Sequence, residues 1–115
     1  ADHISAGTHI ACMGTDTKGK QEVDANLVAA ATVFTDEVAQ SISIGEAQHA
    51  IAQGLINEAD ITPIGEVING THKGRTSDDE ITLFDGTGVG LQDLAVAAVA
   101  ARVAAERGLA TRAAL

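Results

Sequence analysis

The sequence predicts an α/β fold with a parallel sheet and a long helix near its C-terminal end. Short apolar and β-branched runs alternate with stretches in which apolar residues recur every three or four positions. This alternation is typical of parallel sheets whose strands are joined by helices. The composition agrees, because 45% of the 115 residues are hydrophobic and only two are aromatic. Small aliphatic side chains suit buried parallel strands and closely packed helices.

Three runs are predicted to be strands that pair in parallel. Thr8–Met13 is an apolar run followed by Gly14, and Thr32–Thr35 combines β-branched and aromatic residues. Ile81–Phe84 is a third such run and leads into a glycine-rich turn. Three strands are too few for a stable sheet that is covered on both faces. We therefore expect the sheet to be incomplete without an N-terminal portion that precedes these residues.

The segments between the strands are predicted to be helical. Asp24 can cap a helix over Ala25–Ala31, because its carboxylate can accept hydrogen bonds from the first free backbone amides. Shorter helical patterns follow Asp36 and Glu37, lie within Gly45–Gly54, and cover Ile61–Ile68 with Pro63 in the first turn.

The longest predicted element is a helix over Leu91–Arg107, which Gly108 would end. Its apolar residues recur at helical spacing, and alanine is frequent on almost every side. Alanine is the best helix former, and a helix that is apolar all round is usually buried. The composition therefore predicts a helix packed between other layers.

Charge and cysteine content exclude several classes of partner. The formal net charge is −9, so neither nucleic acid nor an anionic membrane surface is an expected partner. The sequence has no apolar run of about 18 residues and no signal-peptide pattern. The single cysteine, Cys12, is predicted to be a buried, inert thiol in a cytoplasmic protein. The four histidines lack metal-ligand spacing, so no metal site is predicted.

Two loops carry residues with possible chemical roles. In GTDTKGK, Asp16 and Lys20 follow the end of a predicted strand, where ligands bind in open α/β sheets. A carboxylate there can exchange a proton with a substrate, and a lysine can neutralise an anionic ligand. The alternative is a solvated turn in which both residues are incidental. The second loop, DGTG, precedes the long helix, whose first amides could meet a polar ligand group.

Whole stretches of the chain are more specific than either loop alone. They are THIACMGTDTKGKQEVD, then GEVINGTHKGRTSDDEITLFDGTGVGLQD, then an alanine-rich helix that ends in ERGL. Over roughly residues 7–109 the chain resembles the ornithine cyclodeaminase/mu-crystallin family. The family pattern GxDxxGKxE is present as Gly14, Asp16, Gly19, Lys20 and Glu22. The later pattern GRxSxxxITLFDSxG is present between Gly74 and Gly88, with glycine at position 86 where many members have serine.

The resemblance implies a Rossmann-type dinucleotide-binding domain, of which residues 1–86 would be the C-terminal half. Residues 87–115 would be a helix leading back towards a substrate and dimerisation domain. It also implies NAD or NADP as cofactor, an amino-acid or imine substrate, and a homodimer or larger assembly. The implied reaction interconverts an amino acid and its imine by hydride transfer.

The resemblance also assigns roles to individual residues. Asp16 falls on the catalytic acid/base, and Thr87 falls on a substrate contact. The positions expected to contact the cofactor are Met13, Gly14, Thr15, Asp16, Lys20 and Gly86.

A second interpretation makes the chain a non-catalytic remnant or subunit that serves as a binding or interaction module. In the family, the phosphate-binding glycine loop, the ribose-binding acid and the Lys/Arg pair for the substrate carboxylate precede this segment, and none is found in these residues. Arg75 is not expected to replace that pair, and a structural role beside Asp78 or Asp79 is expected for it. Exposed strand edges and helix faces predict that the isolated chain associates with itself or with its N-terminal complement.

Overall fold

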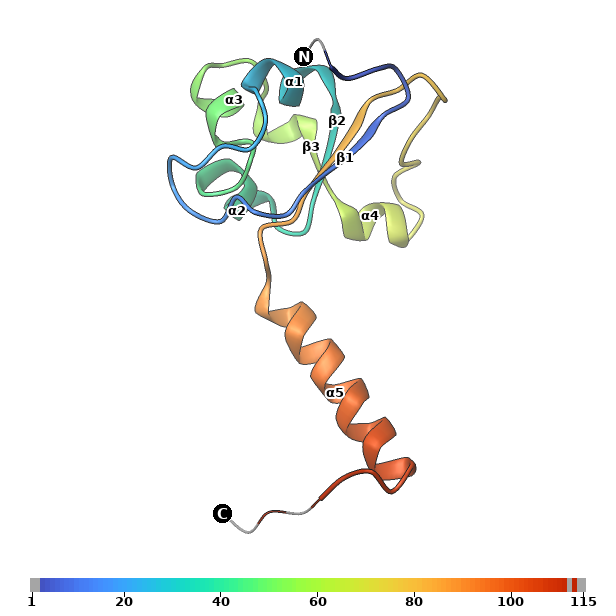
Figure 1. The fold of residues 1–115 in the computed structure, drawn as a ribbon. Coiled ribbons are helices and arrows are strands. Elements are labelled where there is room, and N and C mark those ends of the chain that lie inside the picture. The colour runs from blue at the N-terminus through green and yellow to red at the C-terminus, as the bar shows by residue number, and fades with distance from the viewer. Residues whose placement is uncertain (1–2, 112, 114–115) are drawn as a thin grey trace.

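The computed structural model describes residues 3–111 and residue 113, and it contains a four-stranded parallel sheet (Figure 1). The sheet order is β1-β4-β2-β3. The strands are β1 (His9–Cys12), β2 (Thr32–Thr35), β3 (Ile61–Pro63) and β4 (Thr82–Asp85). The helices are α1 (Ala25–Ala30), α2 (Val38–Ser43), α3 (Gln48–Ala52), the 3₁₀-helix η1 (Glu58–Asp60), α4 (Ile64–Ile68) and α5 (Gly90–Glu106).

The three predicted strands are confirmed, and all of them pair in parallel. The middle strand β4 lies between β1 and β2, with Asp85 opposite both Cys12 and Thr35. The carboxyl ends of these strands are therefore level. The loops that leave them begin at the same edge of the sheet.

The helix predicted over Ile61–Ile68 is wrong in its first part. Ile61–Pro63 forms the short strand β3, and only Ile64–Ile68 is helical. Pro63 lacks a backbone N–H, which an edge strand tolerates on its unpaired side. The sheet order places β3 at such an edge, where it pairs only with β2 among the described strands.

The core lies between the sheet and the helices α1 and α3. Val28, Val33 and Leu83 are almost fully buried in it, together with Cys12 and Ala50. Figure 1 shows α1, α2 and α3 on one side of the sheet and α4 on the other. Asp24 caps α1 as predicted, because its side chain accepts from the Asn26 amide.

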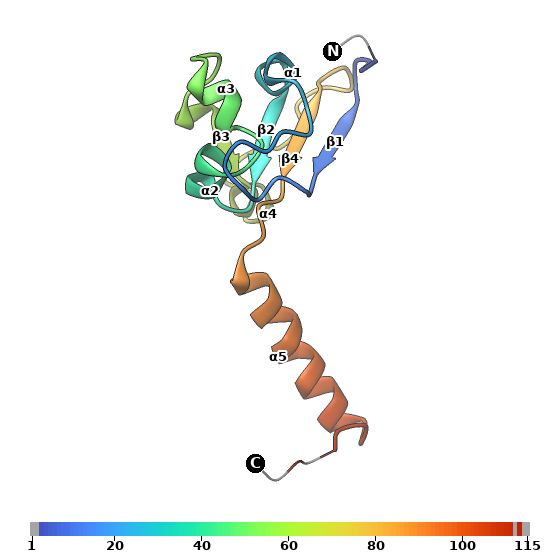
Figure 2. The ribbon, with the colours of Figure 1, turned by 60° about the vertical axis from the view of Figure 1, so that its left-hand side comes forward.

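The long helix α5 projects away from the sheet, as Figures 1 and 2 show from two directions. Its predicted span is confirmed within one residue at each end. Its predicted burial is wrong within the described part of the chain, since no residue of α5 is buried. Leu91 and Leu94 are 72% and 65% exposed. Composition predicts that the helix is apolar, but it does not identify the surface that would cover it. None of the described helices is both long and apolar enough to cross a membrane.

Candidate functional site at the carboxyl edge of the sheet

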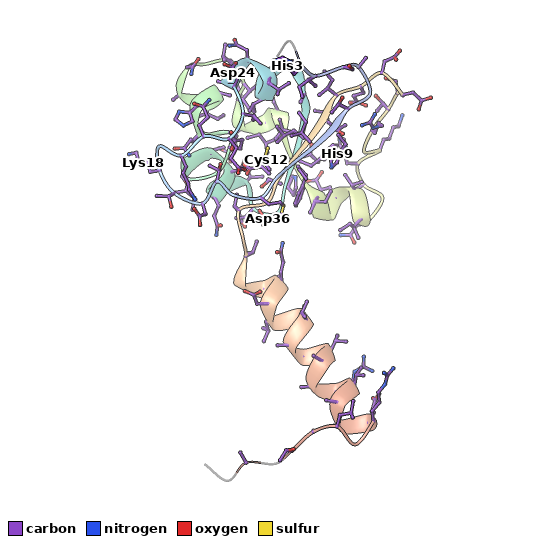
Figure 3. All side chains as sticks on the ribbon, viewed as in Figure 1. His3, His9, Cys12, Lys18, Asp24 and Asp36 are labelled. Carbon is purple, nitrogen blue, oxygen red and sulfur yellow. The ribbon has the colours of Figure 1, made fainter. Side chains whose placement is uncertain are left out.

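The candidate site lies where β1, β4 and β2 end. Figure 3 shows Cys12 and Asp36 near this edge, whereas His3 and Asp24 lie at the opposite end of the sheet. The loop after β1 runs outward to Lys18 (Figure 3), while the turn after β4 leads into α5. The predicted site residues come from these two connections.

Asp16 and Lys20 are brought together in the loop after β1. Lys20 Nζ donates to Asp16 Oδ1 at 2.8 Å and to the Gly14 carbonyl oxygen at 2.8 Å. The two side chains are 64% and 54% exposed, so both remain open to a ligand. Hydrogen bonds from Lys20 and then Thr17, together with the charge of Lys20, hold the pKa of Asp16 below its usual value. Asp16 is therefore an ionised proton acceptor near neutral pH.

The loop that carries Asp16 is fixed by the turn between α2 and α3. The carboxylate of Glu46, only 1% exposed, accepts from the Thr15 hydroxyl and from the amides of Glu22 and Val23. Gln48 accepts from the Gly19 amide at 2.7 Å through Oε1. Its Nε2 donates to the carbonyl oxygens of Thr17, Lys20 and Gly45. The exposed Asp16 thus projects from an ordered backbone.

Glu46 is itself held by the buried side chain of Asp85 at the end of β4. Asp85 Oδ2 accepts from Ser41 Oγ at 2.6 Å and from the Glu46 amide at 2.8 Å. A Cβ at Gly45 would lie 2.6 Å from the same oxygen, so this close approach requires glycine. Burial raises the pKa of Asp85, and the hydrogen bonds from Ser41 and Glu46 only partly oppose that effect.

Thr87 is positioned by Asp36, which follows β2. Asp36 Oδ1 accepts from the Thr87 amide at 3.0 Å and from its hydroxyl at 2.7 Å, and Oδ2 accepts from the Gly88 amide at 3.0 Å. Burial alone would raise the pKa of Asp36. The hydrogen bonds from Thr87, Gly88 and Glu37 outweigh it, so the pKa is lowered. The turn before α5 is therefore built on an ionised carboxylate.

Met13 and Gly86 are neighbours across the ends of β1 and β4. A Cβ at Gly86 would lie 2.6 Å from Met13 Sδ, so the methionine occupies the space that a larger residue at position 86 would take. The Met13 side chain is 67% exposed, and a flexible side chain of this kind can move aside. The pair forms a small apolar surface at the carboxyl edge.

Cys12 is buried, as predicted, and its pKa is raised to about 12. Burial is the largest cause, followed by the charges of Glu46, Asp85 and Glu22. Its sulfur lies within 4.8 Å of carboxylate oxygens of Glu22 and Glu46. Those carboxylates accept hydrogen bonds from the loop amides of Gly14, Glu22 and Val23. The group therefore holds the loop together, and its thiol stays protonated.

Sequence reasoning missed the residues that organise the site, namely Asp36, Glu46, Gln48 and Asp85. The structural role expected for Arg75 agrees with its contacts, but its partners among the described residues are not carboxylates. Its guanidinium donates to the carbonyl oxygens of Gly7 and Asp78 and to Thr82 Oγ1. Arg75 thus joins the start of β1 to the start of β4, far from the carboxyl edge.

A comparison with protein families decides the relationship of the chain. The profile of the ornithine cyclodeaminase/mu-crystallin family matches residues 1–107. The chain belongs to this family. An iminosuccinate reductase from Paracoccus denitrificans is 61% identical over 109 residues, which are 95% of this chain and 34% of the relative.

Solved structures show the same fold. The crystal structure of the Paracoccus denitrificans iminosuccinate reductase in complex with NAD+ matches with a TM-score of 0.92 and 58% identity, covering 99% of this chain and 35% of that one. An archaeal alanine dehydrogenase dimer with bound NAD matches with a TM-score of 0.90 and 39% identity, covering 100% and 36%. The family resemblance and the α/β fold are thereby confirmed. This chain spans about a third of the length of these relatives.

Proposed function

We propose that this chain is part of a longer, NAD(P)-dependent oxidoreductase that interconverts an amino acid and its imine. The observation that carries the proposal is the position of Asp16. It is an exposed carboxylate on a loop fixed at the carboxyl edge of a parallel sheet, where ligands bind in such folds. The likeness to an iminosuccinate reductase and an alanine dehydrogenase, both solved with NAD, supports this class of reaction.

Asp16 is proposed as the residue that moves the proton. As an ionised carboxylate it accepts a proton from the substrate nitrogen when an amino acid is oxidised, and it returns the proton in the opposite direction. Lys20 holds the carboxylate at 2.8 Å and neutralises part of its charge. Thr87 is proposed to contact the substrate, because Asp36 fixes its position at the same edge of the sheet.

The described residues fit one end of a dinucleotide. Met13 and Gly86 present an apolar surface next to the backbone of Gly14 and Thr15, which the carboxylates of Glu22 and Glu46 hold in place. A bound nicotinamide cofactor would supply or accept the hydride, which no side chain can do. We assign Met13, Gly14, Thr15, Asp16, Lys20 and Gly86 to this contact. We propose that the residues that bind the pyrophosphate lie in the remainder of the longer protein.

The test is an assay of the longer protein with NADH and imines formed in solution from 2-oxo acids and ammonia. The imine of oxaloacetate comes first, because the relative at 61% identity is named for iminosuccinate. The Asp16→Asn variant should fold and keep most of its affinity for NADH, because asparagine is nearly isosteric, yet lose on the order of a hundred- to ten-thousand-fold in kcat. An Asn variant with normal kcat would remove Asp16 from the reaction.

A non-catalytic binding or interaction module is the second candidate. It is favoured by α5, whose apolar side chains are exposed, Val96 at 71% and Val99 at 51%. The two candidates differ in what accompanies the chain. A longer polypeptide or companion chain that turns over NADH supports the enzyme. A stable monomer or oligomer of this chain alone that does not bind NADH supports the non-catalytic module.

A further inference from the structure

The carboxylate of Glu46 is buried where an apolar side chain would be expected. Glu46 is 1% exposed and lies in the turn between α2 and α3. Among the described residues no lysine, arginine or histidine forms an ion pair with it. Burying a charge without a cation is costly unless hydrogen bonds satisfy it. A buried glutamate at this position is therefore explained by the hydrogen bonds that its carboxylate accepts, which an apolar side chain could not replace.

Within the described part of the chain, all hydrogen-bond partners of this carboxylate belong to the loop that carries Asp16. Oε2 accepts from the Thr15 hydroxyl at 2.5 Å, directly before Asp16. Oε1 accepts from the amides of Glu22 at 2.9 Å and Val23 at 2.7 Å, at the far end of the loop. Hydrogen bonds to an ionised acceptor are shorter and stronger than neutral ones. One side chain thus clamps both ends of the loop.

The clamp is anchored to the other half of the site. The Glu46 amide donates to Asp85 Oδ2 at 2.8 Å, and Asp85 directly precedes Gly86 and Thr87. Gly45 allows this contact, because a Cβ there would lie 2.6 Å from that oxygen and 2.7 Å from the Ser41 Cα. Glu46 therefore fixes the position of the loop after β1 relative to the turn after β4.

We infer that Glu46 is a positioning residue for the proposed acid/base Asp16, and that it acts by clamping residues 15–23 to the end of β4. It does not touch the substrate, and its effect reaches the reaction only through the placement of Asp16. This inference rests on the proposed function. Small errors in the placement of a reacting group are costly, since about 1 Å can cost on the order of a hundredfold in rate.

The test compares Glu46→Ala and Glu46→Gln in the longer protein, with Asp16→Asn and Val28→Ala measured beside them. Glutamine is nearly isosteric. Its oxygen can accept from the amides of Glu22 and Val23, and its NH2 can donate to Thr15 Oγ1. Alanine can do neither. Val28→Ala is the matched control, because Val28 is fully buried in α1 and its truncation destabilises the protein without removing any hydrogen bond of the clamp.

We expect Glu46→Ala to lower kcat by on the order of ten- to a hundredfold and Glu46→Gln to restore most of it. Val28→Ala should lower the melting temperature and leave kcat nearly unchanged. Hydrogen exchange followed by mass spectrometry should show faster exchange in peptides covering residues 14–23 for Glu46→Ala only. A Glu46→Ala enzyme with normal kcat, or a Val28→Ala enzyme with an equal loss, would overturn the inference.

If the proposed function is wrong, the same experiments give a different result from the one expected if only the clamp is wrong. In that case the wild-type protein would turn over no imine with NADH, and Asp16→Asn would have nothing to lose. Hydrogen exchange would then decide the clamp alone. Unchanged exchange over residues 14–23 in Glu46→Ala would reject it, and faster exchange confined to those residues would support it.

Discussion

Replacement of Asp36 by asparagine tests how the turn before α5 is built. The wild-type carboxylate accepts from Thr87 through Oδ1 and from Gly88 through Oδ2, each at 3.0 Å from the amide nitrogen. Asparagine replaces one of these oxygens by an NH2 group, which cannot accept. In either orientation of the amide, one backbone donor faces another donor, and the remaining bonds lose the assistance of the negative charge.

The expected loss of stability follows from these contacts. One hydrogen bond to a charged group contributes ~1.5–3 kcal/mol, and the exposed position of Gly88 favours the lower part of that range. A loss of about 2 kcal/mol corresponds to a fall in Tm of roughly 8–16 °C for a domain of about 60–100 residues and of roughly 4–8 °C for one of about 150–250 residues. The 115 residues of this chain lie between these two sizes. If Thr87 contacts the substrate, the KM for the imine should rise as well.

The pH dependence gives a second test of the same residue. The pKa of Asp36 is lowered in the folded state from the ordinary value of 3.8. Its stabilising contribution is therefore present above pH 3.8 and is lost as the pH falls through the folded pKa. Thermal melts should show that wild type and Asp36→Asn differ at neutral pH and converge in acid. Asp79→Asn, whose carboxyl makes no hydrogen bond among the described residues, is the control. Equal melting temperatures at neutral pH would refute the reasoning.

Three further outcomes are expected. Lys20→Met removes the first cause of the lowered pKa of Asp16, so the acidic limb of the kcat/KM profile for amino-acid oxidation, in which Asp16 is the proposed base, should move to higher pH. An unmoved limb would show that Lys20 does not act on the base. The buried thiol of Cys12 has its pKa raised to about 12 and should resist thiol reagents until the protein unfolds; rapid labelling of the native protein would contradict this. Its contribution to stability should be lost as the pH rises from 9.0 towards that pKa. The isolated chain should self-associate through its exposed apolar surface, and light scattering that shows a monomer at high concentration would contradict that.

The sheet was largely predictable because its signals are local. The β-branched run Thr32–Thr35 and the apolar run before Gly14 are readable within a few residues. The strand Ile61–Pro63 was not predictable in the same way. It is three residues long and ends in proline, and proline after threonine reads equally well as the first turn of a helix. Its pairing with β2 decided the outcome, and that pairing is a tertiary interaction.

The candidate site was predictable only as far as its loops. Asp16 and Lys20 lie four residues apart, and the likeness to the family names them. The residues that fix those loops have distant partners, since Glu46 bonds Thr15 across 31 positions and Asp36 bonds Thr87 across 51. No periodicity or short motif connects positions so far apart. Only the parallel register, which sets the ends of β1, β4 and β2 level, brings them together.

The exposure of α5 bears on the same site, because the helix begins at the turn that Asp36 holds. Asp36 Oδ2 accepts from the Gly88 amide and lies 3.4 Å from the donor Gln92 Nε2 in the first turn of α5. The direction in which α5 leaves the sheet is thus coupled to the carboxylate that positions Thr87. Apolar residues occupy almost every side of α5, and its alanine-rich sequence marks no single face for burial. Whatever covers this helix must therefore contact more than one side of it.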